Sequence, residues 1–330
     1  MRAIQMTAVG GPDVLQMAEV PEPRIEASTQ VKIRLRAAGV NPIDTKVRGA
    51  GIYVGDRLPA ILGLDGAGEV TEVGEGVTRL KPGDAVWLCN GGLGAEPGTY
   101  AEFVVVDEAV ARLMPSNASF AEAAAAPLVL ITAWESLFDR AHLHEGHTLL
   151  VHAGAGGVGH VAIQLAHHAG ARIAATASAE NAGFLRELGV ERVIDYHAED
   201  FVAAALEWTD GQGVNVCFDA VGGETFARSV QTVAHYGDLV TSLEPPENMS
   251  WREARLRNLR VGFDLMLTPL LGGLPVARTH QGEILDNCAA LFEAGKLVVH
   301  VGARYLLDDA ALAHAELQVG HTRGKRVLLM

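Results

Sequence analysis

The sequence predicts an α/β protein in which a β-rich part precedes a doubly wound parallel sheet. Short runs that alternate apolar and polar residues fill the first third of the chain, as in residues 31–37, and glycine and proline separate them, as in residues 81–84. After residue 148, apolar strands alternate with helical stretches, which is typical of a parallel sheet with helical crossovers. A chain of 330 residues is long enough for two such domains.

The β-rich part is expected to form a barrel-like domain, because many short strands are separated by turns. Its predicted strands include residues 31–37, 69–73 and 85–89. The pattern changes at Ser119, which stands three residues before Glu122 as in a capping box and begins an alanine-rich helix.

The alternating part follows this helix and ends near residue 263. Its predicted strands are residues 149–152, 172–176, 192–194, 214–218 and 239–242, with helices between them such as 160–169 and 184–188. The later segments do not extend this alternation: a helix at 281–294, a strand at 297–301, a helix at 309–317 and a strand at 326–329. We assign them to the first domain, which then comprises residues 1–121 and 264–330, and the second domain comprises residues 122–263.

Composition and charge narrow the possible partners. Hydrophobic residues make up 49% of the chain and charged residues 20%, which is ordinary for a globular protein. Because the net charge is −14 and no block of Lys or Arg occurs, we expect neither nucleic acid nor a membrane surface as a partner. The longest apolar stretch, residues 121–134, is too short and too polar to span a bilayer, and residues 1–10 do not resemble a signal peptide. The three cysteines are far apart and form no CxxC, which fits a reduced, cytoplasmic setting without a disulfide framework.

A glycine-rich turn lies between the first predicted strand and helix of the alternating part. Its residues are Gly154, Ala155, Gly156, Gly157, Val158 and Gly159. This is GxGxxG in the context that dinucleotide binding requires. Gly154 permits the turn, Gly156 lets a pyrophosphate approach the backbone, and Gly159 lets the helix pack on the sheet, while free N–H groups and the helix dipole hold the phosphates. The alternative is a turn without a ligand, and the strand–helix units that follow favour dinucleotide binding.

The end of the second strand favours NADPH over NADH. Sites for NAD usually place an acidic residue about 20 residues after the glycine loop, where it binds the ribose 2′-hydroxyl. Here Thr176 and Ser178 end the strand, and Glu180 comes later. Small hydroxyl residues leave room for a 2′-phosphate, although no Lys or Arg follows at once. The alternative is that Thr176 and Ser178 are ordinary turn residues.

Several motifs are spread over nearly the whole chain: AGVNPID at residues 38–44, GLDGAG at 63–68, KPGD at 81–84, GTYAE at 98–102, and the glycine loop. With them the chain resembles the quinone oxidoreductase branch of the medium-chain dehydrogenase/reductase superfamily. The resemblance implies a GroES-like β domain with a Rossmann domain inserted before its C-terminal part.

The resemblance also implies that no zinc is bound. Zinc alcohol dehydrogenases of this superfamily carry a Cys near the position of Asn41 and a His-Glu pair near Leu64 and Asp65, and this chain has neither. Their structural zinc needs four closely spaced cysteines, which do not occur between Asn90 and Asp107. Without zinc, reduction of a carbonyl loses its Lewis acid. Quinones and conjugated enones or enals remain suitable, because hydride addition gives a delocalised product.

Residues 41–46 resemble the segment that faces the substrate in this family. The resemblance implies that Asn41 lies near the nicotinamide and can donate an amide hydrogen bond. Many relatives have Tyr where this chain has Lys46, but plant alkenal/enone reductases carry Lys there, so Lys46 could donate to a forming enolate. The alternative is a solvated surface Lys. Thr132 resembles a threonine near the nicotinamide, and its alternative is a helix-interior Thr bonded to its own backbone.

Two further positions concern the adenosine phosphate. Tyr196 and Arg323 resemble residues that reach it in some relatives, and Arg323 would supply the missing cation. The resemblance also implies a homodimer that pairs through the last Rossmann strand, residues 259–263, which would otherwise be an exposed edge.

These expectations combine into an NADPH-dependent, zinc-independent reductase of quinones or of the C=C bond of α,β-unsaturated ketones and aldehydes. Two alternatives stay open. One is an enoyl-thioester reductase, against which the lack of a basic entrance patch weighs. The other is a non-catalytic NADPH-binding protein with a sensor or structural role.

Overall fold

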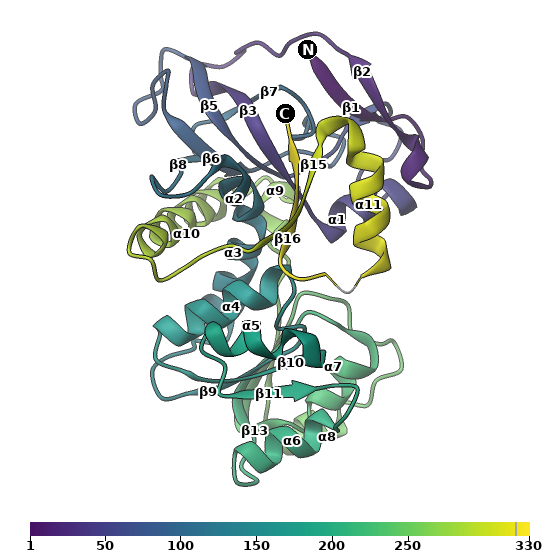
Figure 1. Ribbon diagram of the computed structural model, residues 1–330, viewed down its shortest axis with the longest axis vertical. Coiled ribbons are helices and arrows are strands. Elements are labelled where there is room, and N and C mark those ends of the chain that lie inside the picture. Colours follow the sequence, from purple (N-terminus) through teal and green to yellow (C-terminus); the bar gives the residue numbers. More distant parts are fainter. Residues whose placement is uncertain (321) are drawn as a thin grey trace. The chain divides into compact units, whose positions relative to one another are not determined.

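The computed structural model describes residues 1–320 and 322–330, so His321 lies outside the described residues. The chain divides into two compact units (Figure 1). Unit 1 comprises Met1–Leu128 and Leu267–Met330, and unit 2 comprises Val129–Met266. No helix within the described ranges combines the length and the apolar character needed to cross a membrane. The α/β class predicted from the sequence is confirmed.

Among the described residues, the antiparallel strand pairs lie in unit 1. Its strands are β1 (Arg2–Met6), β2 (Leu15–Glu19), β3 (Gln30–Val40), β4 (Ala60–Ile61), β5 (Asp65–Val73), β6 (Ala85–Cys89), β7 (Phe103–Asp107), β8 (Ala111–Leu113), β15 (Val301–Leu306) and β16 (Lys325–Leu329). Its helices are α1 (Pro42–Ala50), α2 (Phe120–Ala125), α9 (Thr268–Leu271), α10 (Pro275–Glu293) and α11 (Ala310–Val319), with 3-10 turns η1 (Pro12–Val14) and η4 (Leu307–Asp309). One sheet runs β15-β16-β3-β5-β6-β8 with β7 paired to β3, and a smaller sheet runs β2-β1-β4.

The predicted alternation of apolar residues forms the core of unit 1. Val31, Ile33 and Leu35 of β3 are buried and belong to one core cluster with Val86 of β6 and Val104 of β7. Helix α2 begins at the predicted capping box, in which Ser119 N donates to Glu122 Oε2 at 2.8 Å and Glu122 N donates to Ser119 Oγ at 3.3 Å.

Unit 2 is a doubly wound parallel sheet. Its strands are β9 (Thr148–Val151), β10 (Arg172–Ala177), β11 (Arg192–Asp195), β12 (Val214–Asp219), β13 (Val233–Thr241) and β14 (Arg260–Phe263). Its helices are α4 (Gly157–His168), α5 (Ala182–Glu187), α6 (Phe201–Trp208), α7 (Gly223–Ser229) and α8 (Arg252–Leu256), with a 3-10 turn η3 (Ala179–Asn181). Helix α3 (Pro127–Trp134) begins at the boundary of the units and continues as a π-helical turn, η2 (Glu135–Arg140).

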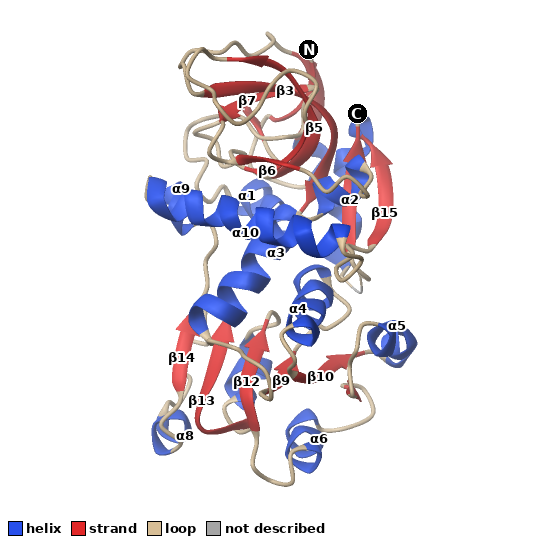
Figure 2. Ribbon diagram, turned by 90° about the vertical axis from the view of Figure 1, so that its left-hand side faces the viewer, coloured by secondary structure: helices blue, strands red, loops and turns tan. Residues whose placement is uncertain are grey.

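The strand order in unit 2 is β11-β10-β9-β12-β13-β14, and every pair is parallel. The order reverses between β9 and β12, which is where ligands bind in sheets of this kind. Helix α4 lies on one face of the sheet, and α6 and α8 lie on the other (Figure 2). The core on one side of the sheet contains Leu150, Phe201, Cys217 and Leu239.

Two predicted elements near the C-terminus were placed wrongly or incompletely. The strand expected at residues 297–301 begins only at Val301, where pairing with Lys325 starts. Leu297 and Val299 are buried, so their alternation reflects packing of an extended segment without a partner strand. The helix expected at 281–294 begins six residues earlier, at Pro275, because proline is favoured at the first position of a helix.

The glycine-rich turn joins β9 to α4 as predicted. Ala153 has a positive φ of 53°, and the chain then passes so close to itself that a Cβ on Gly159 would lie 2.3 Å from the Ala153 carbonyl oxygen. A Cβ on Gly154 would lie 2.8 Å from the Ala175 Cβ. The absence of side chains at these positions therefore allows α4 to begin directly against the end of β9.

We predict that Gly159→Ala destabilises unit 2. The added Cβ would meet backbone atoms that cannot move independently, and overpacking of this kind costs about 1–3 kcal/mol. Thermal or chemical unfolding of the variant measures the loss. Gly183→Ala is the matched control, since Gly183 lies in α5 with no atom within 4 Å of an added Cβ. That change should be neutral or stabilise by about 0.5–1 kcal/mol. Equal stability of the two variants would contradict the close packing of the loop.

Candidate functional site

The glycine loop offers the groups that a dinucleotide pyrophosphate needs. It follows the carboxyl end of β9, where Gly154 N donates to Thr176 O at 2.9 Å and Gly156 N to Ala153 O at 2.9 Å. The N–H groups of residues 157–159, at the start of α4, have no partner within the helix. A helix N-terminus with free donors and no side chains in front of it binds phosphate. These residues therefore fit the pyrophosphate of a dinucleotide.

Thr176 ends β10 with its hydroxyl already bonded inside the protein. Its Oγ1 accepts from Ala153 N at 3.2 Å and lies 3.1 Å from His152 Nδ1. His152 Nε2 lies 2.9 Å from Ser229 Oγ, and burial lowers the pKa of His152 to about 4, so the ring is neutral. These contacts favour the alternative in which Thr176 holds the turn, with its side chain directed to β9.

Ser178 is half-buried beside a carboxylate. Its Oγ donates to Glu180 Oε1 at 3.3 Å and accepts from Asn181 Nδ2 at 2.9 Å. The parallel register sets Ala177 opposite Asp195, so the exposed Tyr196, which follows β11, lies near the same end of the sheet. A 2′-phosphate placed here would meet the hydroxyl of Ser178 and the negative charge of Glu180 together.

Arg323 belongs to unit 1 and is exposed between α11 and β16. It lies close enough to His300 to contribute to the low pKa of that ring, after burial, which is the larger cause. Its assignment to the adenosine phosphate stays a prediction.

Thr132 is buried in α3, one turn before a pair of buried carboxyl groups in unit 2. Asp264 follows β14 and is bonded to Glu135, and Ser136 Oγ donates to Asp264 Oδ2 at 3.3 Å. Burial, and next the charge of Glu135, raises the pKa of Asp264 to about 8.

Polar residues also gather where strands of the unit 1 sheet end. Asn41 follows β3, Asp65 begins β5 and Lys325 begins β16. Because β16 pairs antiparallel with β3 and sets Arg326 opposite Val40, the register brings Lys325 beside Asn41. These strand ends form a compact polar site in unit 1.

The Asn41 side chain is fully buried, and both ends of its amide are bonded. Nδ2 donates to Asp65 Oδ2 at 2.9 Å, and Oδ1 accepts from Lys325 Nζ. Lys325 Nζ also donates to Val40 O at 3.3 Å and lies 3.6 Å from Asp65 Oδ2. A carboxylate can only accept and an ammonium can only donate, so these partners fix which way round the amide lies.

A second chain of bonds runs from the start of α1 to α11. Asp44 Oδ2 accepts from Asn41 N at 2.8 Å and from the Tyr100 hydroxyl at 3.0 Å, and Tyr100 Oη lies 3.0 Å from His314 Nε2. Burial raises the pKa of Asp44 to about 7 and lowers the pKa of His314 to about 3. Helices α1 and α11 pack together in unit 1 (Figure 1), and this chain of bonds links them.

Of the three predicted residues Asn41, Lys46 and Thr132, Lys46 is the exposed one. It lies on α1, two residues after Asp44, and makes no hydrogen bond or ion pair among the described residues. Its ammonium is therefore free to meet a substrate, whereas the amide of Asn41 is held inside the protein.

Zinc does not fit this set of residues. A catalytic zinc ion needs three protein ligands, and within residues 1–320 and 322–330 no group of three or more His, Cys, Asp or Glu is arranged to hold a metal ion. Asp65 Oδ1 already accepts from Leu128 N at 2.8 Å, and the ammonium of Lys325 lies beside Oδ2.

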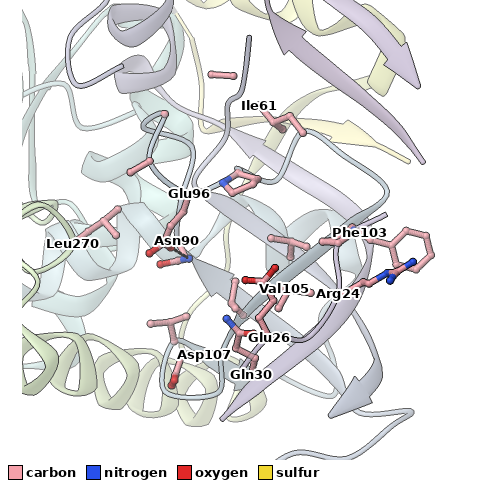
Figure 3. A pocket seen from close by; sticks show the side chains of 18 of the residues that line it. Arg24, Glu26, Gln30, Ile61, Asn90, Glu96, Phe103, Val105, Asp107 and Leu270 are labelled. Carbon is pink, nitrogen blue, oxygen red and sulfur yellow. Dashed lines mark hydrogen bonds between the residues drawn. The ribbon is translucent and has the colours of Figure 1, made fainter. Parts of the chain in front are cut away.

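Unit 1 also has a pocket of about 1040 Å³ (Figure 3). Its wall includes Arg24 and Glu26, and Asn90 Nδ2 donates there to Glu96 Oε2 at 2.7 Å. Of the described residues predicted for the site, none lines this pocket. It is therefore separate from the polar site of unit 1.

Lys325, Tyr100 and His314 are not among the residues that the sequence motifs predict for a site, and no chemistry was expected of Asp44. Asp44 and Tyr100 lie in the AGVNPID and GTYAE motifs, so the motifs marked the region without revealing the contacts. A signal for Lys325 was present, because it begins a strand with the buried apolar residues Val327 and Leu328.

Comparison with known proteins agrees with this architecture. Residues 27–116 match the family described as Alcohol dehydrogenase GroES-like domain, and residues 188–328 match the family described as Zinc-binding dehydrogenase.

Individual relatives match over nearly the whole chain. A quinone oxidoreductase of Pseudomonas aeruginosa is 36% identical over 329 residues, which is 99% of both chains. A 2-methylene-furan-3-one reductase of Solanum lycopersicum is 33% identical over 99% of this chain and 79% of its own length. The crystal structure of the Escherichia coli quinone oxidoreductase complexed with NADPH matches with a TM-score of 0.88 and 30% identity, covering 100% of both chains. The predicted GroES-like and Rossmann domains are thereby confirmed.

We predict that Asp44 makes the stability of the protein fall as the pH rises. Its pKa is about 7 in the folded protein against 3.8 ordinarily, so in this window the folded state binds more protons than the unfolded state. The free energy of unfolding should therefore decrease, by on the order of 4 kcal/mol, between about pH 4 and about pH 7. Asp44→Asn stays neutral and should lack this slope, which denaturant unfolding of both proteins across the pH range measures.

Tyr100→Phe is the control for the cause of this slope. The Tyr100 hydroxyl donates to Asp44 Oδ2 and favours its ionised form. Its removal should shift the slope to higher pH and leave it present. A difference between wild type and Asp44→Asn that is independent of pH would show that Asp44 is ionised throughout.

Proposed function

We propose that the protein is an NADPH-dependent, zinc-independent reductase of quinones or of conjugated enones and enals. The chain belongs to the quinone oxidoreductase family of the medium-chain dehydrogenase/reductase superfamily and is thus an oxidoreductase. The observation that carries the proposal is the glycine loop, packed against α4 through Gly159 at the carboxyl end of β9. The NADPH in the similar Escherichia coli enzyme and the 2-methylene-furan-3-one reductase among the relatives support the cofactor and the unsaturated ketone.

The cofactor side of the proposal rests on unit 2. The N–H groups of Gly157, Val158 and Gly159 would hold the pyrophosphate, with Gly154, Ala155 and Gly156 forming the rest of the loop. Ser178, and Tyr196 beside it, would lie at the adenosine ribose, with Arg323 as a cation for the 2′-phosphate and Thr132 near the nicotinamide. Bound NADPH supplies the hydride.

The substrate side rests on unit 1. Negative charge that grows on the substrate oxygen needs a donor. Lys46 on α1 is exposed and has no hydrogen-bond or ion-pair partner in the part of the chain that the structure describes, so its ammonium could donate to that oxygen. Asn41 stays part of the proposed site because it stands at the start of α1, although its role differs from the amide donor that the resemblance implies. Its buried amide, held by Asp65 and Lys325, favours anchoring this helix over direct donation to the substrate.

Zinc independence is supported by the donor set. Asn41, Leu64 and Asp65 stand where the resemblance places ligands in the zinc-dependent relatives, and Asn41 and Asp65 contact each other and Lys325.

The proposal also includes a cytoplasmic location and a homodimer that pairs through β14, the last strand in the order of its sheet. Sedimentation and cell fractionation test these two points.

A turnover assay of the purified protein tests the activity. NADPH oxidation should be followed with quinones, 2-alkenals and enones as acceptors, with 2-enoyl thioesters as the contrasting class. Binding of NADPH without turnover of any acceptor would favour a sensor or structural protein instead.

We predict that Lys46→Ala slows enone reduction by about a hundredfold, because loss of a single oxyanion donor typically has this effect. The Kd of NADPH should change little, and quinone reduction should suffer less, because quinones accept electrons with little acid help. Steady-state kinetics with both acceptors measures the difference.

Lys296→Ala is the matched control, since Lys296 is also exposed in unit 1 and lies outside the predicted site. If both variants behave alike, Lys46 is a surface residue and solvent supplies the proton. If Lys46→Ala weakens only NADPH binding, Lys46 is a cofactor contact.

We predict opposite effects of charge at the end of β10 on cofactor choice. Ser178→Asp should weaken NADPH by adding repulsion of the 2′-phosphate, and Glu180→Gln should strengthen it by removing a carboxylate that accepts from Ser178. Each change should be several-fold, up to about tenfold, for exposed charges. Fluorescence titration measures both, with NADH as the control, whose Kd should move little. Tighter binding of NADH than NADPH by the wild type would contradict the proposed preference.

A further inference from the structure

We propose that His152 is a positioning residue for the dinucleotide site of unit 2, which it serves by fixing the Thr176 hydroxyl against the glycine loop and by tying that loop to α7. The inference rests on the proposed function, because it takes the loop as the place where the pyrophosphate of NADPH binds. His152 is only 1% exposed, so it acts through its neighbours rather than on the cofactor itself.

The hydrogen bonds around the His152 ring run in one direction. Ser229 Oγ donates its single hydrogen to Thr225 O at 2.6 Å, so it accepts at its 2.9 Å contact with His152 Nε2. At the other end, Ala153 N can only donate, and Thr176 Oγ1 accepts from it at 3.2 Å. A neutral imidazole has one donor and one acceptor nitrogen. His152 therefore carries its hydrogen on Nε2, and its Nδ1 accepts from the Thr176 hydroxyl at 3.1 Å.

The surroundings of the ring keep it neutral and hold it in place. Burial lowers the pKa of His152 to about 4, so the ring carries only one N–H at neutral pH. Phe201 of α6 packs edge-on against the ring, with the two ring centroids 4.8 Å apart. The thiol of Cys217 is also hydrogen-bonded to Ser229, but a thiol is a weak donor and a weak acceptor. The hydroxyl groups of Thr176 and Ser229 therefore decide which ring nitrogen carries the hydrogen.

The ring orients the hydroxyl that holds the left-handed residue of the loop. Ala153 has a φ of 53°, which is unfavourable for a residue other than glycine. Its N–H donates to Thr176 Oγ1, and the next N–H, that of Gly154, donates to Thr176 O at 2.9 Å. Because the hydroxyl hydrogen is used at His152, Oγ1 faces Ala153 as an acceptor. Thr176 therefore shapes the turn and has no hydrogen left to donate to a bound cofactor.

The ring also joins the two loops that border the switch point of the sheet. The strands β10, β9 and β12 are neighbours in that order (Figure 2), the glycine loop follows β9, and α7 follows β12. His152 N donates to Phe218 O of β12 at 3.0 Å, and the His152 side chain reaches Ser229 at the end of α7. A dinucleotide at the switch point would meet both loops. A fixed spacing between them reduces the conformational freedom that is lost on binding.

Binding of NADPH to variants of the full-length protein tests this role. His152→Met keeps the bulk of the side chain without its hydrogen bonds, and it should raise the Kd of NADPH by about tenfold, because the loop loses its preorganisation. The Kd of NADH should rise by the same factor, since both cofactors contain the pyrophosphate. His152→Gln retains a donor and an acceptor and should recover most of the affinity. Fluorescence titration measures these constants.

A purely structural role of His152 predicts a different result. It would lower the melting temperature and leave the Kd of the folded variant unchanged, so melting is measured alongside binding. His168→Met is the matched control, because His168 is exposed at the last turn of α4, and its Kd should equal that of the wild type. A folded His152→Met variant that binds NADPH as tightly as the wild type would overturn the proposal, whatever its melting temperature.

A double-mutant cycle tests whether His152 acts through Thr176. Thr176→Val removes the hydroxyl at nearly constant volume and should also weaken NADPH binding. The double variant His152→Met/Thr176→Val should bind NADPH more tightly than the product of the two single effects predicts, because both changes remove the same support of Ala153. Effects on the Kd that simply multiply would show that the two residues act independently, and the proposed chain would then be wrong.

The tautomer of the wild type keeps the proposal testable if the variants do not fold. Nitrogen-15 NMR distinguishes a protonated ring nitrogen from an unprotonated one, and the His152 ring can be assigned through its backbone. We expect the hydrogen on Nε2 at neutral pH. A hydrogen on Nδ1 would reverse the bond to Thr176 and overturn the proposal, as would a ring protonated at both nitrogens.

The outcomes separate this inference from the proposed function. An active wild type whose folded His152→Met variant has an unchanged Kd for NADPH would keep the function and lose the inference. A wild type that binds NADPH and reduces none of the acceptors would lose the function, whereas weaker binding by His152→Met would still support the role of the ring.

Discussion

The pairing of β16 with β3 is the constraint on which unit 1 depends. It joins the two ends of a discontinuous unit, and it sets Arg326 opposite Val40, so that Lys325 reaches Asn41 and Asp65. A slip of one residue would turn the side chains of β16 to the opposite face and remove the ammonium from a buried carboxylate. The strand register and the charge pair therefore support each other. The register of β16 places the ammonium of Lys325 beside Asp65, and any other register would leave the carboxylate of Asp65 buried and unpaired, which is unfavourable.

Unit 2 depends on a constraint of space rather than of charge. Gly159 has to approach the Ala153 carbonyl oxygen, and Thr176 Oγ1 holds Ala153 N at 3.2 Å, so the turn is fixed from both sides. Thr176 also lies next to the neutral ring of His152, which extends the bonding to Ser229. A loop fixed in this way loses little conformational freedom when a phosphate binds, and that preorganisation favours affinity. The polar residues at the ends of β9 and β10 thus serve the site by shaping its backbone.

The fold and the glycine loop could be predicted because their signals are local. Alternation along residues 31–37, the capping box at Ser119 and GxGxxG after a strand each describe a few consecutive residues. The contacts of Lys325 could not be predicted in this way, because they join residues separated by 284 positions and depend on strand register. The prediction of a strand at 297–301 was wrong for the same reason. The alternation of apolar residues indicates which side chains are buried, whereas strand pairing depends on a partner that is distant in the sequence. The contact of Thr176 Oγ1 with the His152 ring likewise could not be predicted without the position of His152.

The buried ammonium of Lys325 limits the chemistry that the polar site of unit 1 can perform. A catalytic metal ion keeps an open position for a substrate oxygen, whereas the ammonium of Lys325 is buried with its donors directed to fixed acceptors. It stabilises the site and cannot polarise a substrate carbonyl. In the proposed reaction the growing negative charge has to be met elsewhere, and Lys46 on α1 is exposed and has no ion-pair partner among the described residues. A single exposed ammonium is a weaker electrophile than a metal ion. Acceptors whose reduced form spreads its charge, as a hydroquinone or an enolate does, need the least help and are therefore the ones that this arrangement suits.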